Sequence, residues 1–332
     1  SKHSIEKQTA HYVDCFTTVS EITNNECKEL LDKPADVVLM NGFEDDFVPK
    51  GATFTGKRKR ARSTMLRVAN CLLGEDLGDD TLIIGTSGRY EFKNKGIDVF
   101  LESLNRLNRD KDLKKKVLAF VNVPSWVGDP REDLQKRLKS KDKFTEPLQC
   151  PFITHWLHNM THDQVLDMLK YLGMGNRPED KVKVIFVPCY QDGHDGILNK
   201  HYYDLILGED LSVYPSYYEP WGYTPLESVA FRVPTITTDL AGFGLWVNSL
   251  KNQHGIDDGV EVLHRSDYNY SEVADGIKDT VALFSTKTEA EIKEIRKRAG
   301  QVAEQALWKH FIKYYYEAYD IALCNAMKRQ LR

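Results

Sequence analysis

Short apolar runs rich in β-branched residues recur along the chain, separated by stretches in which apolar residues fall at helical spacing. Near-continuous apolar runs predict strands buried on both faces. Their alternation with helices predicts a parallel α/β sheet covered on both sides. After the second run, Ile97, Phe100, Leu101, Leu104 and Leu107 follow helical spacing. The expected strands are residues 36–40, 81–88, 115–123, 181–188, 211–216 and 233–239.

Other helical patterns lie outside this alternation. Residues 52–75 predict a helix ahead of the main run, which places a domain boundary near residue 80. This helix carries the basic cluster GKRKRARS at 56–63, interpreted as a solvated face or linker, with phosphate or polyanion binding as the alternative. Residues 287–305 form a charged helical pattern, and residues 306–330 form a long aromatic-rich one.

Composition narrows the class of protein. With 332 residues, of which 41% are hydrophobic, the chain can bury the core of one large or two ordinary domains. Its net charge of -4, with both signs interspersed, is unlike the basic footprint of a nucleic-acid binder. No run approaches the roughly 18 apolar residues of a membrane span, and no signal peptide is visible. The first residue is Ser rather than Met, so the chain is interpreted as a piece of a protein that starts earlier.

The spacing of the cysteines and histidines indicates the cellular compartment and whether the chain has a metal site. Six cysteines without CxxC spacing argue against a disulfide framework or structural zinc, and indicate a reducing, cytoplasmic compartment. His155, His158 and His162 would share one face if their stretch were helical, and three histidines can hold zinc. Only Asp163 and the more distant Cys150 reinforce that set, so no metal is expected.

The loop after the second expected strand carries positive charge where a ligand would bind. In open parallel α/β sheets, ligands bind at the carboxyl ends of the strands. Arg89 offers a planar fork for phosphate oxygens and Lys95 a point charge, while Gly88 and Gly96 let the backbone approach closely. The alternative is an ordinary strand–helix loop with surface charges.

The stretch SYYEPWGYTPLES, residues 216–228, combines a helix start with two glutamates. Thr224 as N-cap, Pro225 at the first helical position and Glu227 as capping-box carboxylate form a start signature. Free N–H groups and the positive dipole end of such a helix suit a diphosphate. Glu219 precedes the helix, and both carboxylates can accept hydrogen bonds from sugar hydroxyls. The tyrosines and tryptophan shape a crevice or, alternatively, belong to the core.

Tyr202 and Tyr203 are candidates to stack on a nucleobase, since aromatic faces accept any base, with a packed helix face as the alternative. Taken together, the basic pair, the helix start, the two carboxylates and the aromatic platform describe a nucleoside-diphosphate-sugar site.

Several segments resemble glycogen synthase of the animal and fungal type, a family of retaining glucosyltransferases with two facing Rossmann-like domains, the GT-B architecture. They are GRYEFKNKGIDVFLESLNRLN, DKVKVIFVP, SVYPSYYEPWGYTPLES and VPTITTDLAGFG. FTTVSEIT and a later NG resemble the end of the family's first domain. The resemblance implies an α/β fold with a Rossmann-like, doubly wound parallel sheet, plus a remnant of the N-terminal Rossmann-like domain.

The resemblance also implies catalytic roles for three residues. Arg89 and Lys95 would grip the donor diphosphate, and Glu219 would contact the glucosyl hydroxyls. No metal or cofactor is expected, because the cations and the helix dipole can offset the charge of the leaving diphosphate. In such enzymes the acceptor hydroxyl attacks the face from which UDP leaves, and the leaving phosphate helps to take its proton.

Substrate-binding roles follow from the same resemblance. Glu227 would reach the donor ribose and Tyr202 would stack on the base. The helix start at Gly222, Tyr223 and Thr224 would support phosphate through its backbone.

The resemblance divides the chain into four parts. Residues 1–48 are the last part of the N-terminal acceptor-side domain, 49–80 a helical linker, 81–300 the nucleotide-sugar-binding domain, and 301–332 helices that pack back toward the N-terminal domain. The family's early Gly-rich loop and the donor-contacting His and Arg of its first domain have no counterpart here. The chain is therefore interpreted as N-terminally truncated, and by itself it is expected to be weakly active or inactive.

The predicted function is transfer of glucose from UDP-glucose or ADP-glucose to the non-reducing end of an α-1,4-glucan, glycogen, without nucleic-acid or membrane partners. Homo-oligomerisation and the choice between UDP and ADP stay open. In place of the family's arginine-rich helix that senses glucose 6-phosphate, this chain keeps only Lys293, Arg296, Lys297 and Arg298, in a different arrangement. That regulation is not expected, and a bacterial member is inferred.

Two alternatives stay open. One is another GT-B glycosyltransferase with a different acceptor, such as a sucrose or trehalose phosphate synthase. The other is a non-catalytic nucleotide-sugar or glycan-binding module. The joint retention of Arg89, Lys95, Glu219 and Glu227 argues against the second, because a decayed site would lose at least one of them.

Overall fold

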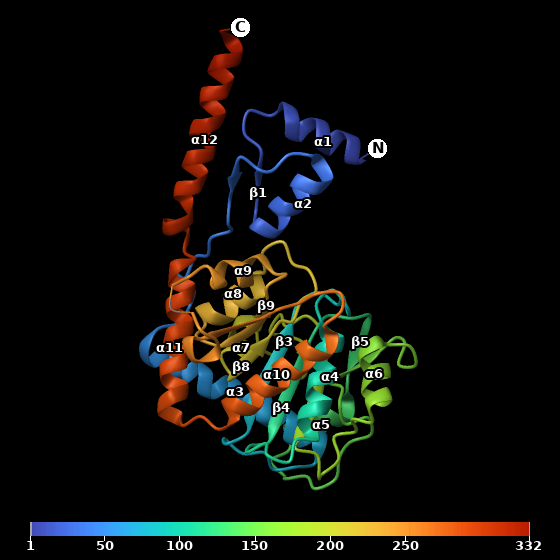
Figure 1. The fold of residues 1–332 in the computed structure, drawn as a ribbon. Helices are drawn as coiled ribbons and strands as arrows, with labels where there is room; N and C mark the ends of the chain where they lie inside the picture. The colour runs from blue at the N-terminus through green and yellow to red at the C-terminus, as the bar shows by residue number, and fades with distance from the viewer. Residues whose placement is uncertain (1, 252, 332) are drawn as a thin grey trace.

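The computed structural model describes residues 2–251 and 253–331, and its centre is a six-stranded parallel sheet (Figure 1). The strand order is β10-β9-β8-β3-β4-β7, and every pair of neighbours runs parallel. The strands are β3 (Leu82–Ser87), β4 (Val117–Asn122), β7 (Val182–Val187), β8 (Leu211–Val213), β9 (Thr235–Thr238) and β10 (Val260–Leu263).

Five of the six expected strands coincide with β3, β4, β7, β8 and β9. The first expected strand yields only β2 (Val37–Val38), which pairs with β1 (Thr17–Thr18) in a separate two-stranded sheet. The apolar pattern does not predict β10, because in this edge strand only Val260 is buried. It also misses a short antiparallel pair, β5 (Val127–Pro130) and β6 (His155–Leu157).

Helices pack on both faces of the sheet, which confirms the doubly wound class. Alternate strand positions face opposite cores: Ile84 and Val121 lie in one, Ile83 and Phe120 in the other. The helices of the first core are α4 (Ile97–Asn108), α6 (Gln164–Leu172) and α10 (Tyr270–Ser285). Those of the second are α3 (Gly51–Leu73), α5 (Glu132–Lys139) and the end of α7 (Tyr202–Ile206).

A third core lies between the sheet and the C-terminal helices. Phe231 and Phe243 are fully buried in it, together with Ala299 from the charged helical pattern. Its elements are α8 (Tyr223–Ala230), α9 (Gly242–Asn248), α11 (Glu289–Gln305) and the start of α12 (Trp308–Gln330). The 3₁₀ turn η1 (Ile256–Asp258) packs against α11, but its Ile256 belongs to the first core. Within the described residues, no helix is both long and apolar enough to cross a membrane.

The predicted helix over 52–75 is present as α3, but two of its arginines are not a solvated face. Arg58 Nη2 and Arg62 Nη1 lie 2.5 and 2.6 Å from the two carboxylate oxygens of Asp210. Arg58 also donates to the carbonyl of Leu207 at 2.7 Å. Burial favours the neutral carboxyl, but the charges of Arg62 and Arg58 outweigh it and hold the pKa of Asp210 below its ordinary value. These contacts tie α3 to the segment that enters β8.

The N-terminal unit contains α1 (Lys2–Tyr12) and α2 (Glu21–Leu31) with β1 and β2, and the far half of α12 runs beside it (Figure 1). Arg329 donates to both carboxylate oxygens of Asp14, at 2.7 and 2.9 Å. The C-terminal helix therefore contacts the N-terminal unit, as expected, while the four-part domain division stays a prediction.

Replacing Asp210 with Asn is expected to lower the free energy of unfolding by about 3 kcal/mol, because two partly buried guanidinium groups lose their carboxylate. The matched control is Asp204→Asn, which removes the half-exposed partner of Lys57 on the same helix, 2.8 Å away. That change is expected to cost less than about 1 kcal/mol. Urea unfolding followed by circular dichroism measures both, and equal losses would contradict an anchoring role for Asp210.

Candidate active site

A cavity of about 370 Å³ opens at the carboxyl ends of three neighbouring strands, where parallel α/β sheets bind ligands. It is lined from the end of β3, from the segments after β4 and β7, and from α7 and α8. The lining residues are Ser87, Gly88, Arg89, Tyr90, Asn122, Pro124, Cys189, Tyr190, Gln191, Tyr202 and Thr224. Three predicted site residues, Arg89, Tyr202 and Thr224, are thus brought to one cavity.

The loop after β3 places its two predicted phosphate-binding cations, Arg89 and Lys95, differently. Arg89 is exposed at the edge of the cavity, with Nη1 lying 3.1 Å from the carboxylate of Glu91. Lys95 is largely buried and forms an ion pair with Glu219. A Cβ built on Gly88 would lie 4.0 Å from Cε of Lys95, so the lysine passes beside the start of the loop. The site therefore contains one exposed cation, Arg89, and one largely buried cation, Lys95, each paired with a carboxylate.

The helix-start prediction is wrong by two residues. Helix α8 begins at Tyr223, and its N-cap is Gly222, whose φ of 107° favours glycine. Thr224 is the second helical residue, and Pro225 the third, where its missing N–H still costs no helical bond. A Cβ built on Gly222 would lie 3.5 Å from Cγ of Glu219, an ordinary contact distance, so the helix start lies directly beside that glutamate.

Glu227 is not a capping-box carboxylate. Its Oε1 accepts a hydrogen bond of 2.7 Å from the hydroxyl of Tyr203, and burial raises its pKa. Tyr203 stacks on Phe231 with ring centroids 5.2 Å apart, and its ring also lies against Phe47. Of the two tyrosines considered for base stacking, Tyr203 therefore supports Glu227, whereas half-buried Tyr202 lines the cavity.

The aromatic residues of the 216–228 stretch do not form one crevice. Trp221 is 3% exposed and packs against Phe243, Trp246 and Phe311, so it belongs to the core, as the alternative interpretation held. Tyr218 donates to Glu26 of α2 at 2.6 Å, and Tyr217 donates to Asp267. Tyr223 is exposed at the helix start.

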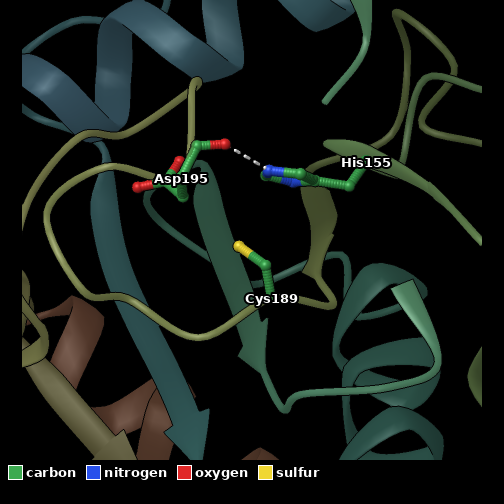
Figure 2. A group of neighbouring side chains, drawn as sticks. All are labelled: His155, Cys189 and Asp195. Atoms are coloured by element: carbon green, nitrogen blue, oxygen red, sulfur yellow. Dashed lines mark hydrogen bonds between the residues drawn. The ribbon is translucent and has the colours of Figure 1, made fainter. Parts of the chain in front are cut away.

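The three histidines do not share a helical face, because His155 lies in strand β6 while His158 and His162 are exposed beyond it. A different group offers ligand atoms within 4.8 Å of one another, His155, Cys189 and Asp195 (Figure 2). Nε2 of His155 lies 2.7 Å from the carbonyl oxygen of Asp195, and Nδ1 lies 2.9 Å from Oγ1 of Thr154. Burial lowers the pKa of His155 and raises that of Cys189 to about 12.

Both ring nitrogens of His155 are thus engaged in hydrogen bonds, which suits a neutral imidazole and a thiol. The carboxylate of Asp195 accepts the backbone N–H groups of Ile197, Leu198 and Asn199 at 2.7 to 2.9 Å. These contacts explain the group as an anchor that holds the segment after β7 on β6.

Two polar residues, one at the end of β4 and one after β7, were not among the predicted site residues. Gln191 Nε2 donates to Oδ1 of Asn122 at 2.8 Å, and both line the cavity. The sequence contained a signal for both residues, because each lies near the end of an expected strand, as Arg89 does.

The chain matches the family model described as glycogen synthase, over residues 1–131 and 129–332. It is 28% identical over 387 residues to the glycogen [starch] synthase of Neurospora crassa, covering 98% of this chain and 54% of that one. It is 29% identical over 397 residues to glycogen [starch] synthase isoform 2 of Saccharomyces cerevisiae, covering 100% and 56%. The chain spans about half the length of the curated relatives it matches.

Among solved structures, the chain is similar to the Anabaena protein HepE in complex with UDP and glucose. The TM-score is 0.53 at 15% identity, covering 94% of this chain and 63% of the other. At that identity the likeness concerns the fold alone, and it agrees with the expected GT-B class.

Replacing Gly96 with Ala is expected to lower the free energy of unfolding by about 3 kcal/mol, because the new Cβ would overlap the carbonyl of Pro215 at a φ of 66°. Gly173→Ala is the control, since its φ is 70° and nothing lies within 4 Å of its Cβ position. Backbone strain alone there is expected to cost about 1 kcal/mol. Denaturant titration compares them, and a larger loss at Gly173 would contradict the close loop contact.

Proposed function

Since the chain belongs to the glycogen synthase family, we propose that it carries the donor-binding part of a retaining glucosyltransferase. The reaction is transfer of glucose from UDP-glucose to the non-reducing end of an α-1,4-glucan. Because the chain spans about half the length of its curated relatives, nucleotide binding is the step that its own residues test most directly.

The ion pair of Lys95 and Glu219 beside the cavity is the observation that carries this proposal. In a sugar nucleotide the diphosphate and the hexose are adjacent, so a cation next to a carboxylate matches both groups. Lys95 would turn from Glu219 to the diphosphate when the donor binds. Glu219 would then accept hydrogen bonds from the glucosyl hydroxyls.

The remaining groups fit the rest of the donor. Tyr202 offers a ring in the cavity for the base, and Arg89 at the edge can reach the diphosphate. The backbone N–H groups of Tyr223 and Thr224 at the start of α8 favour a phosphate oxygen. Glu227, held by Tyr203, would accept a hydrogen bond from the ribose.

The proposed transfer step breaks the bond from C1 of glucose to the diphosphate and forms a bond from C1 to the acceptor oxygen on the same face. The proton of the acceptor hydroxyl moves to the leaving phosphate oxygen. Arg89, Lys95 and the start of α8 stabilise the charge that develops on the diphosphate. The stacking surface of Tyr202 accepts uracil or adenine, so the choice of nucleotide is left to measurement. A cytoplasmic location is part of the same proposal.

Calorimetric titration of UDP into the chain is expected to show saturable binding, and Lys95→Ala is expected to weaken it by about 10- to 100-fold, the worth of a charge-assisted hydrogen bond. Lys93→Ala is the matched control, because that lysine lies in the same loop and is exposed. A parallel titration of ADP ranks the nucleotides. Wild-type chain that binds neither nucleotide would contradict the donor site proposed here.

Glu219→Gln is expected to keep UDP binding, because the substitution leaves Lys95 without its competing carboxylate. The same variant is expected to weaken UDP-glucose by about 10-fold, since an amide replaces the carboxylate that accepts from the sugar hydroxyls. Competition calorimetry with both ligands measures the difference. Equal effects on the two ligands would contradict a role for Glu219 at the sugar.

A further inference from the structure

A continuous line of side-chain hydroxyl groups connects the cavity with a buried carboxyl group. From the cavity inward, Oη of Tyr202 lies 3.0 Å from Oγ of Ser87, which lies 3.4 Å from Oη of Tyr214. Tyr214 Oη lies 3.0 Å from Oγ of Ser228. The line then ends at Glu209.

At the inner end, Ser228 donates to Oγ of Ser212 at 2.9 Å, and Ser212 donates to Oε2 of Glu209 at 2.6 Å. Ser212 and Ser228 are fully buried, and Glu209 and Tyr214 are each 4% exposed. A Cβ at Gly85 would overlap the carboxyl group of Glu209, so the glycine in β3 makes room for it. The sheet therefore accommodates a carboxyl group that the proposed transfer step does not use.

Each hydroxyl in this line has one proton, so the direction of one hydrogen bond determines the direction of the next. When Glu209 is ionised it can only accept, and Ser212, Ser228, Tyr214, Ser87 and Tyr202 each donate toward it. Tyr202, whose side chain lines the cavity, then has its proton committed to Ser87 and none to give to a ligand. When Glu209 is protonated and donates to Ser212, the line can reverse, and the proton of Tyr202 becomes available to a ligand.

Both protonation states are accessible near neutral pH. Burial raises the pKa of Glu209 to about 8, against the opposing effect of the Ser212 hydroxyl and with a contribution from the charge of Asp210. Arg58 and Arg296 donate to the backbone carbonyl of Glu209 at 2.7 and 3.1 Å.

Other charged and titratable groups lie near Glu209 and along the line. Arg62 faces Asp210. Burial lowers the pKa of Arg58 and of Arg296 below the ordinary value of a guanidinium group. Asp210, held by two arginines, stays ionised. Burial raises the pKa of both Tyr202 and Tyr214, so the phenols stay neutral. Glu227 lies near Tyr202, and burial raises its pKa as well. The experiment must therefore distinguish the titration of Glu227 from that of Glu209.

We propose that Glu209 is a positioning residue that acts through Ser212, Ser228, Tyr214 and Ser87 and determines whether the hydroxyl of Tyr202 donates to the bound sugar nucleotide. The inference rests on the proposed donor site, since it assigns Tyr202 to that ligand. Protonated Glu209 gives the state that binds more tightly, because phosphate and sugar oxygens accept hydrogen bonds.

The test is UDP-glucose affinity, measured by calorimetry at about pH 6 and about pH 9, on either side of the Glu209 titration. For the wild-type chain the affinity for UDP-glucose is expected to fall about fivefold with rising pH, which corresponds to the net contribution of one hydrogen bond. In Glu209→Gln and in Ser228→Ala this pH dependence is expected to disappear. Ser228→Ala interrupts the line without replacing Glu209, Tyr202 or Glu227, so it separates the relay from a direct effect of either carboxylate.

Ser103→Ala is the control, a buried serine of α4 that donates to the carbonyl of Phe100 at 2.6 Å and lies outside the line. It is expected to keep the wild-type pH profile. Thermal unfolding of each variant checks the fold, and Ser228→Ala keeps the test available if Glu209→Gln does not fold. A pH profile that persists in Ser228→Ala would overturn the proposal.

A readout without ligand separates this inference from the proposed function. The ¹³Cζ resonance of Tyr202, assigned by its loss in Tyr202→Phe, is expected to shift with pH in the wild-type chain and not in Ser228→Ala. If the shift occurs but UDP-glucose does not bind, the relay stands and the donor site fails. If UDP-glucose binds but the resonance of Tyr202 does not depend on Ser228, the relay fails and the donor site stands.

Discussion

The arrangement of the candidate site depends on one close backbone contact, between Gly96 and the carbonyl of Pro215. Any side chain at residue 96 would separate the loop after β3 from the loop before α8. The N–H of Tyr217 donates to the carbonyl of Asn94 at 2.8 Å and holds the same two loops together. Lys95 therefore meets Glu219 although 124 positions separate them in the chain. How closely these two loops pack therefore determines which charged side chains of the site meet.

Two neighbouring acidic residues show how environment, rather than residue type, decides ionisation. Asp210 faces Arg58 and Arg62, which hold its pKa down despite burial. Glu209 faces a serine hydroxyl and the space above Gly85, and burial raises its pKa to about 8. One carboxylate ties α3 to the sheet as a permanent anion. The other is free to exchange a proton at the end of a line of hydroxyl groups that reaches the cavity.

Helix α8 joins several parts of the molecule. Its start, at Gly222, lies beside Glu219, and its side chain Ser228 belongs to the line that ends at Glu209. The residue just before it, Trp221, is buried among Phe243, Trp246 and Phe311, the last from α12. Packing of the C-terminal helix therefore supports the orientation of the helix start that the donor would contact.

The sequence by itself determined five of the six strands of the central sheet and the edge of the sheet at which the candidate site lies. Continuous apolar runs are buried on both faces in β3, β4 and β7, and the carboxyl ends of parallel strands meet at one edge, so the sequence predicted that Arg89 and Lys95 lie at that edge, while their roles stay a proposal. Only the tertiary structure decided that Tyr203 supports Glu227, that Trp221 is core and that His155 meets Asp195. These outcomes depend on contacts between distant segments and on which side chains lose water, and local periodicity contains neither.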